Sequence, residues 1–242
     1  MTVEVDLDAV LAEAVAPVLA GSRASLSVAV LDLGTGRSAS YGGEGRTYDT
    51  ASVVKLDILV ALLLRAQDEG RGLTPTERAA ADAMIRRSDN ASATALWERI
   101  GGAGGLDAAG ARLGLSRTSG ATAWGLTQTT VADRLALLEA VFGADSPLAG
   151  DSRAYATELL EGVVADQGWG VSAAGDGPAL KNGWLPRDAT GLWDVNSVGR
   201  VTADGRAFLV AVLSDGHVTK DAGVESVERA ARAAVSAVGA AL

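Results

Sequence analysis

The sequence predicts a mixed α/β fold of the α+β kind, in which terminal helices flank a five-stranded antiparallel sheet and an all-helical lobe is inserted. Two observations predict it. Strand-like segments occur only near the two ends of the chain, whereas the stretch between them has almost wholly helical periodicity. One antiparallel sheet built from both ends is the simplest way to bury all five strand faces.

The first elements are a helix and a hairpin. The stretch from Met1 to about Gly21 is amphipathic and predicts a helix. Residues 27–33 (SVAVLDL) alternate and are rich in β-branched types, and the turn residues of 34–43 (GTGRSASYGG) surround a second short strand. These segments predict a hairpin near the N-terminus.

The remaining elements follow the same reasoning. Helices are expected from about Ser52 to Phe142, most of them closed by a glycine, and one more over residues 151–164. A final helix is expected from about Asp221 to Ala240. Turn residues split the stretch before it into three strands, PALKNGWL (178–185), GLWDVNSVGRV (191–201) and RAFLVAVLS (206–214).

The domain organisation follows from length. A chain of 242 residues buries roughly 70% or more of its unfolded surface, and no repeat or long linker divides it. We expect a single domain over residues 1–242. Residues 1–48 and 170–242 would form its α/β lobe, and residues 49–169 a mainly helical lobe.

Composition excludes several functions. The net charge of −9 and the absence of a basic stripe argue against nucleic acid or an anionic membrane as partners. No cysteine is present, and the single histidine, His217, rules out a multi-His metal site. We expect no metal, no cofactor, a monomer with a small-molecule substrate, and His217 at the surface or in a cap.

Localisation is predicted from two segments. Glu4, Asp6 and Asp8 stand where a secretory signal would carry positive charge, and the apolar run Leu56–Leu64 is far shorter than the roughly 20 residues that span a bilayer. The chain as given is therefore expected to be cytoplasmic. A secreted protein trimmed to an added methionine would have the same sequence.

Lys55 is the unusual residue of that apolar run. The chain has three lysines against eighteen arginines, yet Lys55 precedes nine residues of which only Asp57 is polar. If Ser52 opens the helix, the Lys55 amine is its neighbour on the same face, and burial would lower the amine pKa enough for it to accept a proton from the serine. The plain alternative is that Ser52 caps the helix while Lys55 extends to solvent.

Two further motifs accompany this S-x-x-K. Ser88-Asp89-Asn90 lies between two predicted helices, and Lys181-Asn182-Gly183 lies on a predicted strand. S-x-x-K, S-D-N and K-T-G in this order are the signature of class A β-lactamases and penicillin-binding proteins. From about Ser25 to its end, the chain resembles this family of penicillin-recognising serine hydrolases. Separately, the second motif could be a capping loop, and Lys181 an exposed strand lysine.

The resemblance implies a role for each matching residue. Ser52 would be the nucleophile that forms an acyl-enzyme with a small ester, amide or lactam, with Lys55 as proton acceptor and Ser88 as hydroxyl relay. Asn90 would bind a substrate amide, and Lys181 would place positive charge near a substrate carboxylate. The backbone N–H groups of Ser52 and Trp184 would form the oxyanion hole. Gly183 would let the substrate approach.

Three departures limit the resemblance. The family's β-lactamases carry a water-activating glutamate on a loop that corresponds to Ser116–Gln128 here, and this segment contains no carboxylate. Asn182 replaces a threonine that meets the substrate carboxylate, although an amide can still donate. Trp184 stands at the oxyanion-hole position and is expected to cap the cleft. The departures imply weak or atypical β-lactamase activity at most.

Two alternatives remain open at this stage. A non-catalytic β-lactamase-like binding protein fits the missing glutamate and the altered third motif. A D-alanyl peptidase needs no such glutamate, but it needs export to reach the cell wall.

Overall fold

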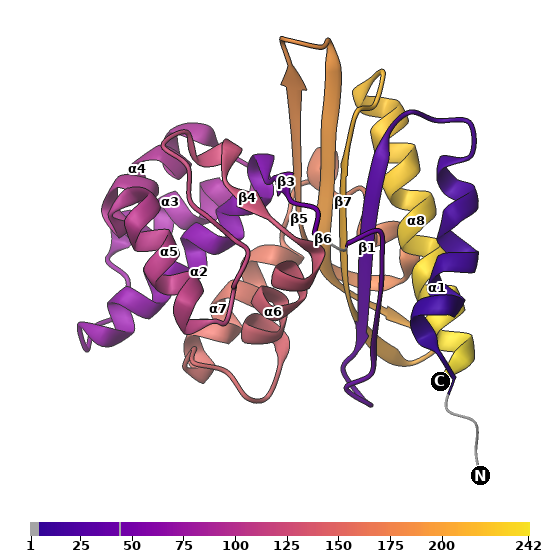
Figure 1. The fold of residues 1–242 in the computed structure, drawn as a ribbon. Helices are drawn as coiled ribbons and strands as arrows, with labels where there is room; N and C mark the ends of the chain where they lie inside the picture. The colour runs from indigo at the N-terminus through magenta and orange to yellow at the C-terminus, as the bar shows by residue number, and fades with distance from the viewer. Residues whose placement is uncertain (1–4, 44) are drawn as a thin grey trace.

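The computed structural model describes residues 5–43 and 45–242, and in it both ends of the chain contribute to one sheet (Figure 1). The sheet has the order β2-β1-β7-β6-β5, and every neighbouring pair is antiparallel. Its strands are β1 (Ser25–Asp32), β2 (Ser38–Tyr41), β5 (Asp176–Arg187), β6 (Leu192–Ala203) and β7 (Arg206–Asp215). The predicted fold class is confirmed.

Helices lie on both sides of the sheet (Figure 1). The terminal helices α1 (Leu7–Val15) and α8 (Lys220–Ala241) cover one face. The helices between β2 and β5 gather beyond the other face; they are α2 (Val54–Asp68), α3 (Pro75–Arg86), α4 (Asn90–Ile100), α5 (Gly102–Arg112), α6 (Val131–Phe142) and α7 (Gly150–Glu161). None of the helices in the described residues is long and apolar enough to cross a bilayer.

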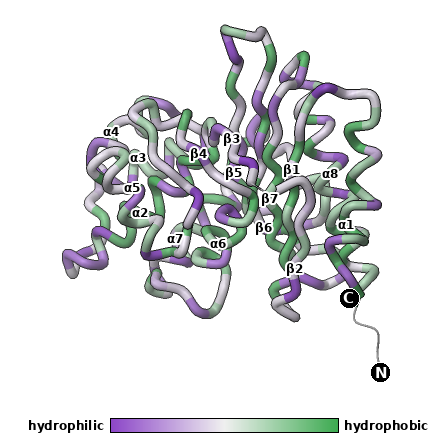
Figure 2. Tube along the Cα trace, in the orientation of Figure 1, coloured by the Kyte–Doolittle hydropathy of each residue, from purple (hydrophilic) through white to green (hydrophobic). Residues whose placement is uncertain are grey.

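Side chains of the central strands alternate between two apolar clusters. Val28 and Val30 of β1 pack with α1 and α8, whereas Ala29 and Leu31 pack with the helical lobe. These strands run as hydrophobic stretches through the middle of the molecule (Figure 2). Because both faces are covered, the sheet is a rigid support for residues at its β5 edge.

Local capping explains where the terminal helices begin. The Asp6 carboxylate accepts a hydrogen bond from the Ala9 backbone N–H (3.1 Å), and the Thr219 hydroxyl accepts one from Ala222 at the start of α8. The first four residues of the predicted N-terminal helix lie outside the described residues. After α1 the chain continues as a short 3₁₀ helix, η1 (Ala16–Leu19), with Pro17 in its first turn.

The structure also contains a short strand pair that the sequence pattern did not predict. β3 (Tyr48–Asp49) pairs with β4 (Gln128–Thr129), and each has only two residues, too few to show a period of two. The pair ties the segment just before Ser52 to the loop between α5 and α6. The division of the chain at residues 48/49 and 169/170 remains a prediction.

Candidate active site

Ser52 lies in a strained turn that precedes the N-terminal end of α2. It belongs to the 3₁₀ helix η2 (Ala51–Val53), and Ala51 has a φ of +46°, a left-handed conformation that is costly for a residue with a side chain. The side-chain amide of Asn196 on β6 donates to the backbone carbonyls of Asp49 (2.9 Å) and Thr50 (3.1 Å). These bonds stabilise the turn.

The start of α2 therefore differs from the expectation. The helix was expected to open at Ser52, but its regular part begins at Val54. The left-handed backbone of Ala51 is incompatible with a continuous α-helix. Ser52, the candidate nucleophile, therefore lies in the tighter 3₁₀ turn before α2.

Lys55 is fully buried, as its apolar surroundings suggested. Its side-chain nitrogen donates to the Ser88 carbonyl (2.6 Å), the Ser88 hydroxyl (3.0 Å) and Asn90 Oδ1 (2.7 Å). Within the described part of the chain, none of its hydrogen bonds goes to Ser52, which corrects the expectation of a direct bond. Burial lowers the pKa of Lys55 to about 8, against a smaller upward effect of the Asp89 carboxylate.

Lys181 reaches the same hydroxyl from the sheet. The residue is fully buried, and its side-chain nitrogen donates to Ser88 Oγ (3.1 Å) and to the Asn182 carbonyl (2.8 Å). Burial, and then the charge of Lys55, hold the pKa of Lys181 well below its usual value. Lys181 is thus not the exposed strand lysine of the alternative interpretation.

The Ser88-Asp89-Asn90 loop acts both as a helix cap and as part of the candidate active site. Asp89 does cap α4, because its carboxylate accepts from the Ser92 backbone N–H (2.7 Å). Ser88 itself has a φ of +56°, a strained conformation that turns its hydroxyl to both lysines.

Gly183 brings strand β5 against the nucleophile turn. A Cβ atom at this position would lie 2.7 Å from the Ser52 backbone nitrogen, 2.8 Å from that of Val53 and 2.9 Å from the Thr50 carbonyl oxygen. Only glycine allows this approach, so its role here is to admit the neighbouring backbone rather than a substrate. The contact also places the backbone of Trp184 beside that of Ser52.

The side chains of Asn182 and Trp184 contact other residues on the face of β5 that is turned away from Ser52. The Asn182 amide donates to the carbonyls of Gln167 and Trp169 (both 2.8 Å), and its side chain is buried. It therefore does not point a donor at a substrate carboxylate, which corrects that expectation. The Trp184 indole packs against Trp169 at 6.0 Å between ring centroids, and the Lys220 nitrogen lies 3.9 Å from its centroid.

Trp124 is a member of the site that the sequence analysis did not single out. It lies on the 3₁₀ helix η3 (Trp124–Leu126), and its ring centroid is 5.1 Å from the Lys55 nitrogen. The indole N–H donates to the Thr94 hydroxyl (3.2 Å). The one available signal was a single aromatic residue in a loop whose other residues, apart from Leu126, are small or polar.

Buried polar residues anchor the loop that carries Trp124. Asp57 of α2 and Arg134 of α6 form a buried ion pair (2.8 Å between Arg134 Nη2 and Asp57 Oδ1), and Arg134 also donates to the Thr118 hydroxyl (3.2 Å). That hydroxyl donates to Asp133 Oδ2 (2.7 Å), which also accepts from the Arg117 backbone N–H (2.9 Å). The loop is thus fixed against α6.

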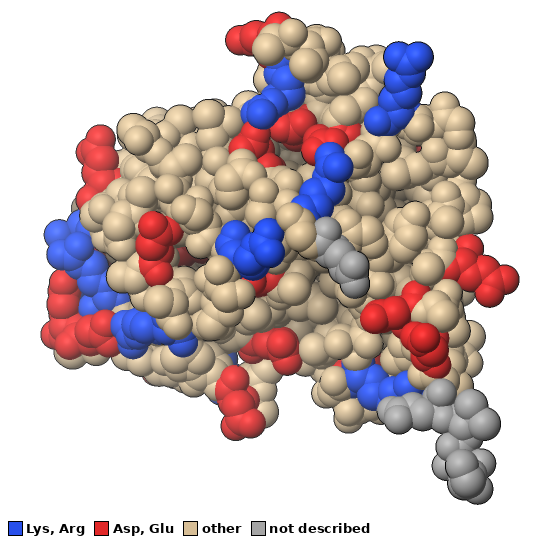
Figure 3. Space-filling view, viewed as in Figure 1, with Lys and Arg blue, Asp and Glu red and all other residues tan. Residues whose placement is uncertain are grey.

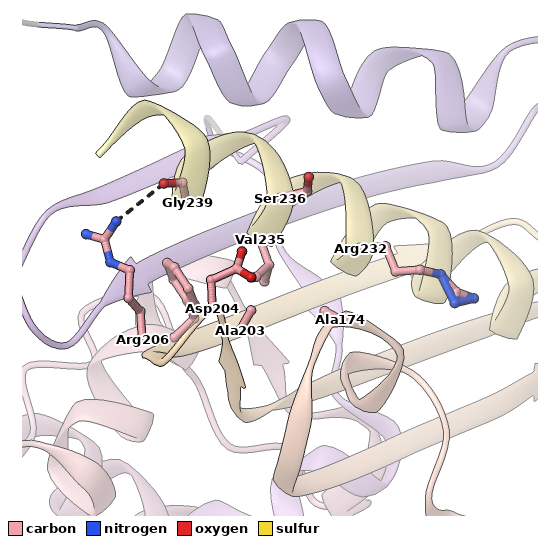
Figure 4. Close-up of a pocket in the computed structure, with 9 residues that line it drawn as sticks. Ala174, Ala203, Asp204, Arg206, Arg232, Val235, Ser236 and Gly239 are labelled. Atoms are coloured by element: carbon pink, nitrogen blue, oxygen red, sulfur yellow. Dashed lines mark hydrogen bonds between the residues drawn. The ribbon is translucent and has the colours of Figure 1, made fainter.

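A pocket of about 290 Å³ opens beside Ser52 between this loop and β5. A separate cavity of about 280 Å³ lies under the C-terminal half of α8, with Arg206 and Arg232 projecting in different directions (Figure 4). It borders Ala203, seven residues and about 24 Å along β6 from Asn196, so it is remote from Ser52. Among the described residues, no group of His, Cys, Asp and Glu has an arrangement that could hold a metal ion.

The buried position of His217 differs from the expectation of a surface or capping residue. Its ring is almost fully buried, its Nε2 lies 2.9 Å from the Ser214 hydroxyl, and its backbone bridges to Trp193. Burial lowers its pKa, despite the opposing charge of Asp215. A neutral, partnered core histidine is its role in this fold.

The chain belongs to the beta-lactamase enzyme family, whose family model matches residues 67–238. That range includes Ser88, Asn90 and Lys181 but begins after Ser52. Solved structures with the same fold include the TLA-1 extended-spectrum beta-lactamase (TM-score 0.84, 18% identity, 95% of this chain and 98% of that one). PBP-A is also similar (TM-score 0.80, 21% identity, 96% of both chains).

A curated relative matches over a shorter segment. The putative lipoprotein LppW of Mycobacterium tuberculosis is 41% identical over 97 residues, which is 40% of this chain. The matched segment spans 30% of the length of that relative.

Proposed function

We propose that the protein is a serine hydrolase that forms an acyl-enzyme on Ser52 with a small ester, amide or lactam, and that releases the acyl group slowly. The observation that carries the proposal is the convergence of the Lys55 and Lys181 nitrogens on the Ser88 hydroxyl, with Lys55 three residues after Ser52. Burial favours the neutral form of both amines, and a neutral amine can accept a proton. Two such amines at one hydroxyl therefore form an arrangement suited to proton transfer.

Acylation would use these groups in sequence. Lys55, as a neutral amine, takes the proton of Ser52 while the serine oxygen bonds to the substrate carbonyl carbon. Ser88 accepts hydrogen bonds from both lysines, so its own proton is free to pass to the leaving nitrogen or oxygen, and Lys55 replaces it. The bond to the leaving group breaks, and one proton has moved from Ser52 to that group.

Substrate contacts would come from two other groups. The backbone N–H groups of Ser52 and Trp184 are candidates for the oxyanion hole, since Gly183 brings their segments into contact. Asn90 Oδ1 accepts a hydrogen bond from Lys55, so the Asn90 amide nitrogen would be the group that donates to a substrate carbonyl.

Deacylation would lack a carboxylate base. The segment Ser116–Gln128 contains neither Asp nor Glu, and the residue it brings next to Lys55 is Trp124. General-base assistance is typically worth about 10²- to 10⁴-fold, so its absence from this step alone would make the acyl-enzyme accumulate. A variant of PBP-A, 22% identical with a TM-score of 0.80, was solved as its acyl-enzyme complex with penicillin G, which supports a comparable adduct here.

A second candidate function is a β-lactamase-like protein that binds its ligand without catalysis. One observation favours it: in the described residues, the three hydrogen bonds of Lys55 are all made to Ser88 and Asn90. One of them must break before the amine can accept a proton from Ser52.

Export is part of the proposal as well. The relative LppW is named a putative lipoprotein, which favours an exported protein over the cytoplasmic placement expected from the sequence. Export would also admit a D-alanyl peptidase activity on cell-wall peptides. Fractionation of cells that express the natural gene separates the two placements.

Intact-protein mass spectrometry tests the acyl-enzyme. The protein is mixed with benzylpenicillin or a reactive ester, and the adduct is located after digestion. We expect one adduct per chain on the peptide that contains Ser52, and none in Ser52→Ala. An adduct on another serine would overturn the nucleophile assignment, and the absence of any adduct would favour the binding protein.

A further inference from the structure

We propose that the pocket beside Ser52 is an acyl-group subsite for uncharged apolar groups of aromatic size, and that Trp124 determines this preference. The proposal rests on the acyl-transfer function proposed above. Trp124 and Leu126 form one wall of the pocket, Leu185 and the backbone of Trp184 form the other, and Ser52 also borders it. The Trp184 indole packs against Trp169 and Lys220 on the opposite face of β5. One indole and two leucines beside a nucleophile form an apolar surface that favours an apolar substituent on the reacting carbonyl.

Charge is the second argument. The residues that line this pocket, all within the described part of the chain, include no Lys, Arg, Asp or Glu. The three lysines of the protein are engaged elsewhere: Lys55 and Lys181 at Ser88, and Lys220 over the Trp184 ring. A carboxylate on the acyl chain would lose its hydration without gaining a cation, so anionic acyl groups are disfavoured.

The wall formed by Trp124 is built before a substrate arrives. Its indole N–H donates to Thr94, which fixes the ring plane. Gly125 lies against the nucleophile turn, since a Cβ there would be 3.9 Å from the Ala51 Cα, and the loop is anchored to α6 through Thr118. A preformed aromatic surface loses little conformational entropy on binding. Most of the favourable free energy of stacking a flat group on it therefore contributes to affinity.

The surface of the molecule seen in Figure 3 is not dominated by one charge. Lys and Arg side chains are interspersed with Asp and Glu over the surface in Figure 3, and large areas between them are uncharged. Selection among uncharged acyl groups would depend on the pocket itself, because long-range electrostatic attraction acts on charged ligands.

A series of p-nitrophenyl esters tests the subsite, because the leaving group is constant and only the acyl group changes. In each reaction Ser52 Oγ bonds to the acyl carbon, p-nitrophenolate leaves, and Lys55 takes the serine proton. Acylation rate constants are measured for the acetyl, phenylacetyl and succinyl monoesters and divided by the rates of hydroxide hydrolysis. We expect phenylacetyl to exceed acetyl by at least about tenfold, and succinyl to fall below acetyl.

Two substitutions of Trp124 locate the preference. Trp124→Ala should bring the phenylacetyl-to-acetyl ratio close to that of hydroxide, whereas Trp124→Phe should keep most of it. Trp97→Phe, which changes a buried indole of α4 outside the pocket, should keep the wild-type ratio.

The outcomes separate this proposal from the one on which it rests. If no ester acylates Ser52 in the wild type, the acyl-transfer function itself is contradicted. If Ser52 is acylated but all three esters react in proportion to hydroxide, or succinyl is preferred, the subsite is contradicted while acyl transfer stands. An unchanged ratio in Trp124→Ala would remove Trp124 as its determinant.

Discussion

The side-chain nitrogens of Lys55 and Lys181 lie 3.0 and 3.1 Å from one oxygen, the Ser88 hydroxyl. Both amines are fully buried, and both have a pKa below the usual value because burial disfavours the charged form. The two amines therefore titrate as a coupled pair, in which the charge of one disfavours the charge of the other. The resulting access to a neutral amine is the physical basis of the proposed acylation.

Acylation should depend on the protonation of Lys55. Because burial lowers the pKa of the amine to about 8, the neutral, proton-accepting form grows with pH and levels off above that value. We expect the acylation rate to rise about tenfold per pH unit below 8 and to reach a plateau above it. Rapid-mixing measurements with a reactive ester give the profile.

Replacement of the amine provides the control for this profile. Lys55→Ala should lower acylation by about 10²- to 10⁴-fold and remove the step near pH 8, with an unchanged far-ultraviolet circular dichroism spectrum. A step that persists in Lys55→Ala would assign the titration to another group.

The buried Lys181 should make stability depend on pH. Its pKa in the folded protein lies well below the value of 10.5 in an unfolded chain, so the unfolded state binds more protons in between, and the free energy of unfolding rises with pH towards 10.5. Lys181→Met should lose up to about 1 kcal/mol per pH unit of this slope. Urea unfolding between pH 8 and 10 measures it, and Lys220→Met should keep the wild-type slope.

Gly183 should be intolerant of any side chain. A methyl group there meets the backbone of Thr50, Ser52 and Val53 within 3 Å, so Gly183→Ala must displace either β5 or the nucleophile turn. We expect a loss of about 1–3 kcal/mol in unfolding free energy and a large loss of acylation. Gly104→Ala on α5, where nothing lies within 4 Å, should be neutral or stabilising by about 0.5–1 kcal/mol. Equal effects of the two substitutions would contradict the close approach.

The buried pair of Asp57 and Arg134 should hold the Trp124 loop in place. Asp57→Asn leaves a buried guanidinium without its charge partner, which costs about 3–5 kcal/mol. Asp68→Asn, which removes an exposed partner of Arg112, should cost at most about 1 kcal/mol. Thermal unfolding compares the two, and proteolysis near Thr118 reports whether the loop is released. A loop that stays protected in Asp57→Asn would show that Asp133 anchors it alone.

The sequence predicted those parts of the site that depend on local pattern. The apolar run after Lys55 predicted its burial. Alternation in residues 27–33, together with the turn residues that separate the three C-terminal strands, predicted a sheet made from both ends of the chain. Motif order placed Ser88 and Lys181 with Lys55, and the structure brings these three side chains together. Their catalytic roles are still proposals.

Features that depend on tertiary packing were not predictable. Trp124 lies near Lys55 in a loop that is anchored through Thr118 to α6, and no local pattern encodes that contact. The direction of the Asn182 amide is decided by the carbonyls of Gln167 and Trp169, which come from a neighbouring loop. The strained Ala51 depends on Asn196, far along the chain on β6.

Pre-steady-state kinetics with a chromogenic cephalosporin test the central claim most directly, since they separate formation of the Ser52 acyl-enzyme from its release. The account predicts a burst of one product per protein molecule, absent in Ser52→Ala, followed by turnover about 10²- to 10⁴-fold slower. Rapid linear turnover without a burst would contradict it, because it would mean that a second base activates the deacylating water despite the absence of a carboxylate in Ser116–Gln128.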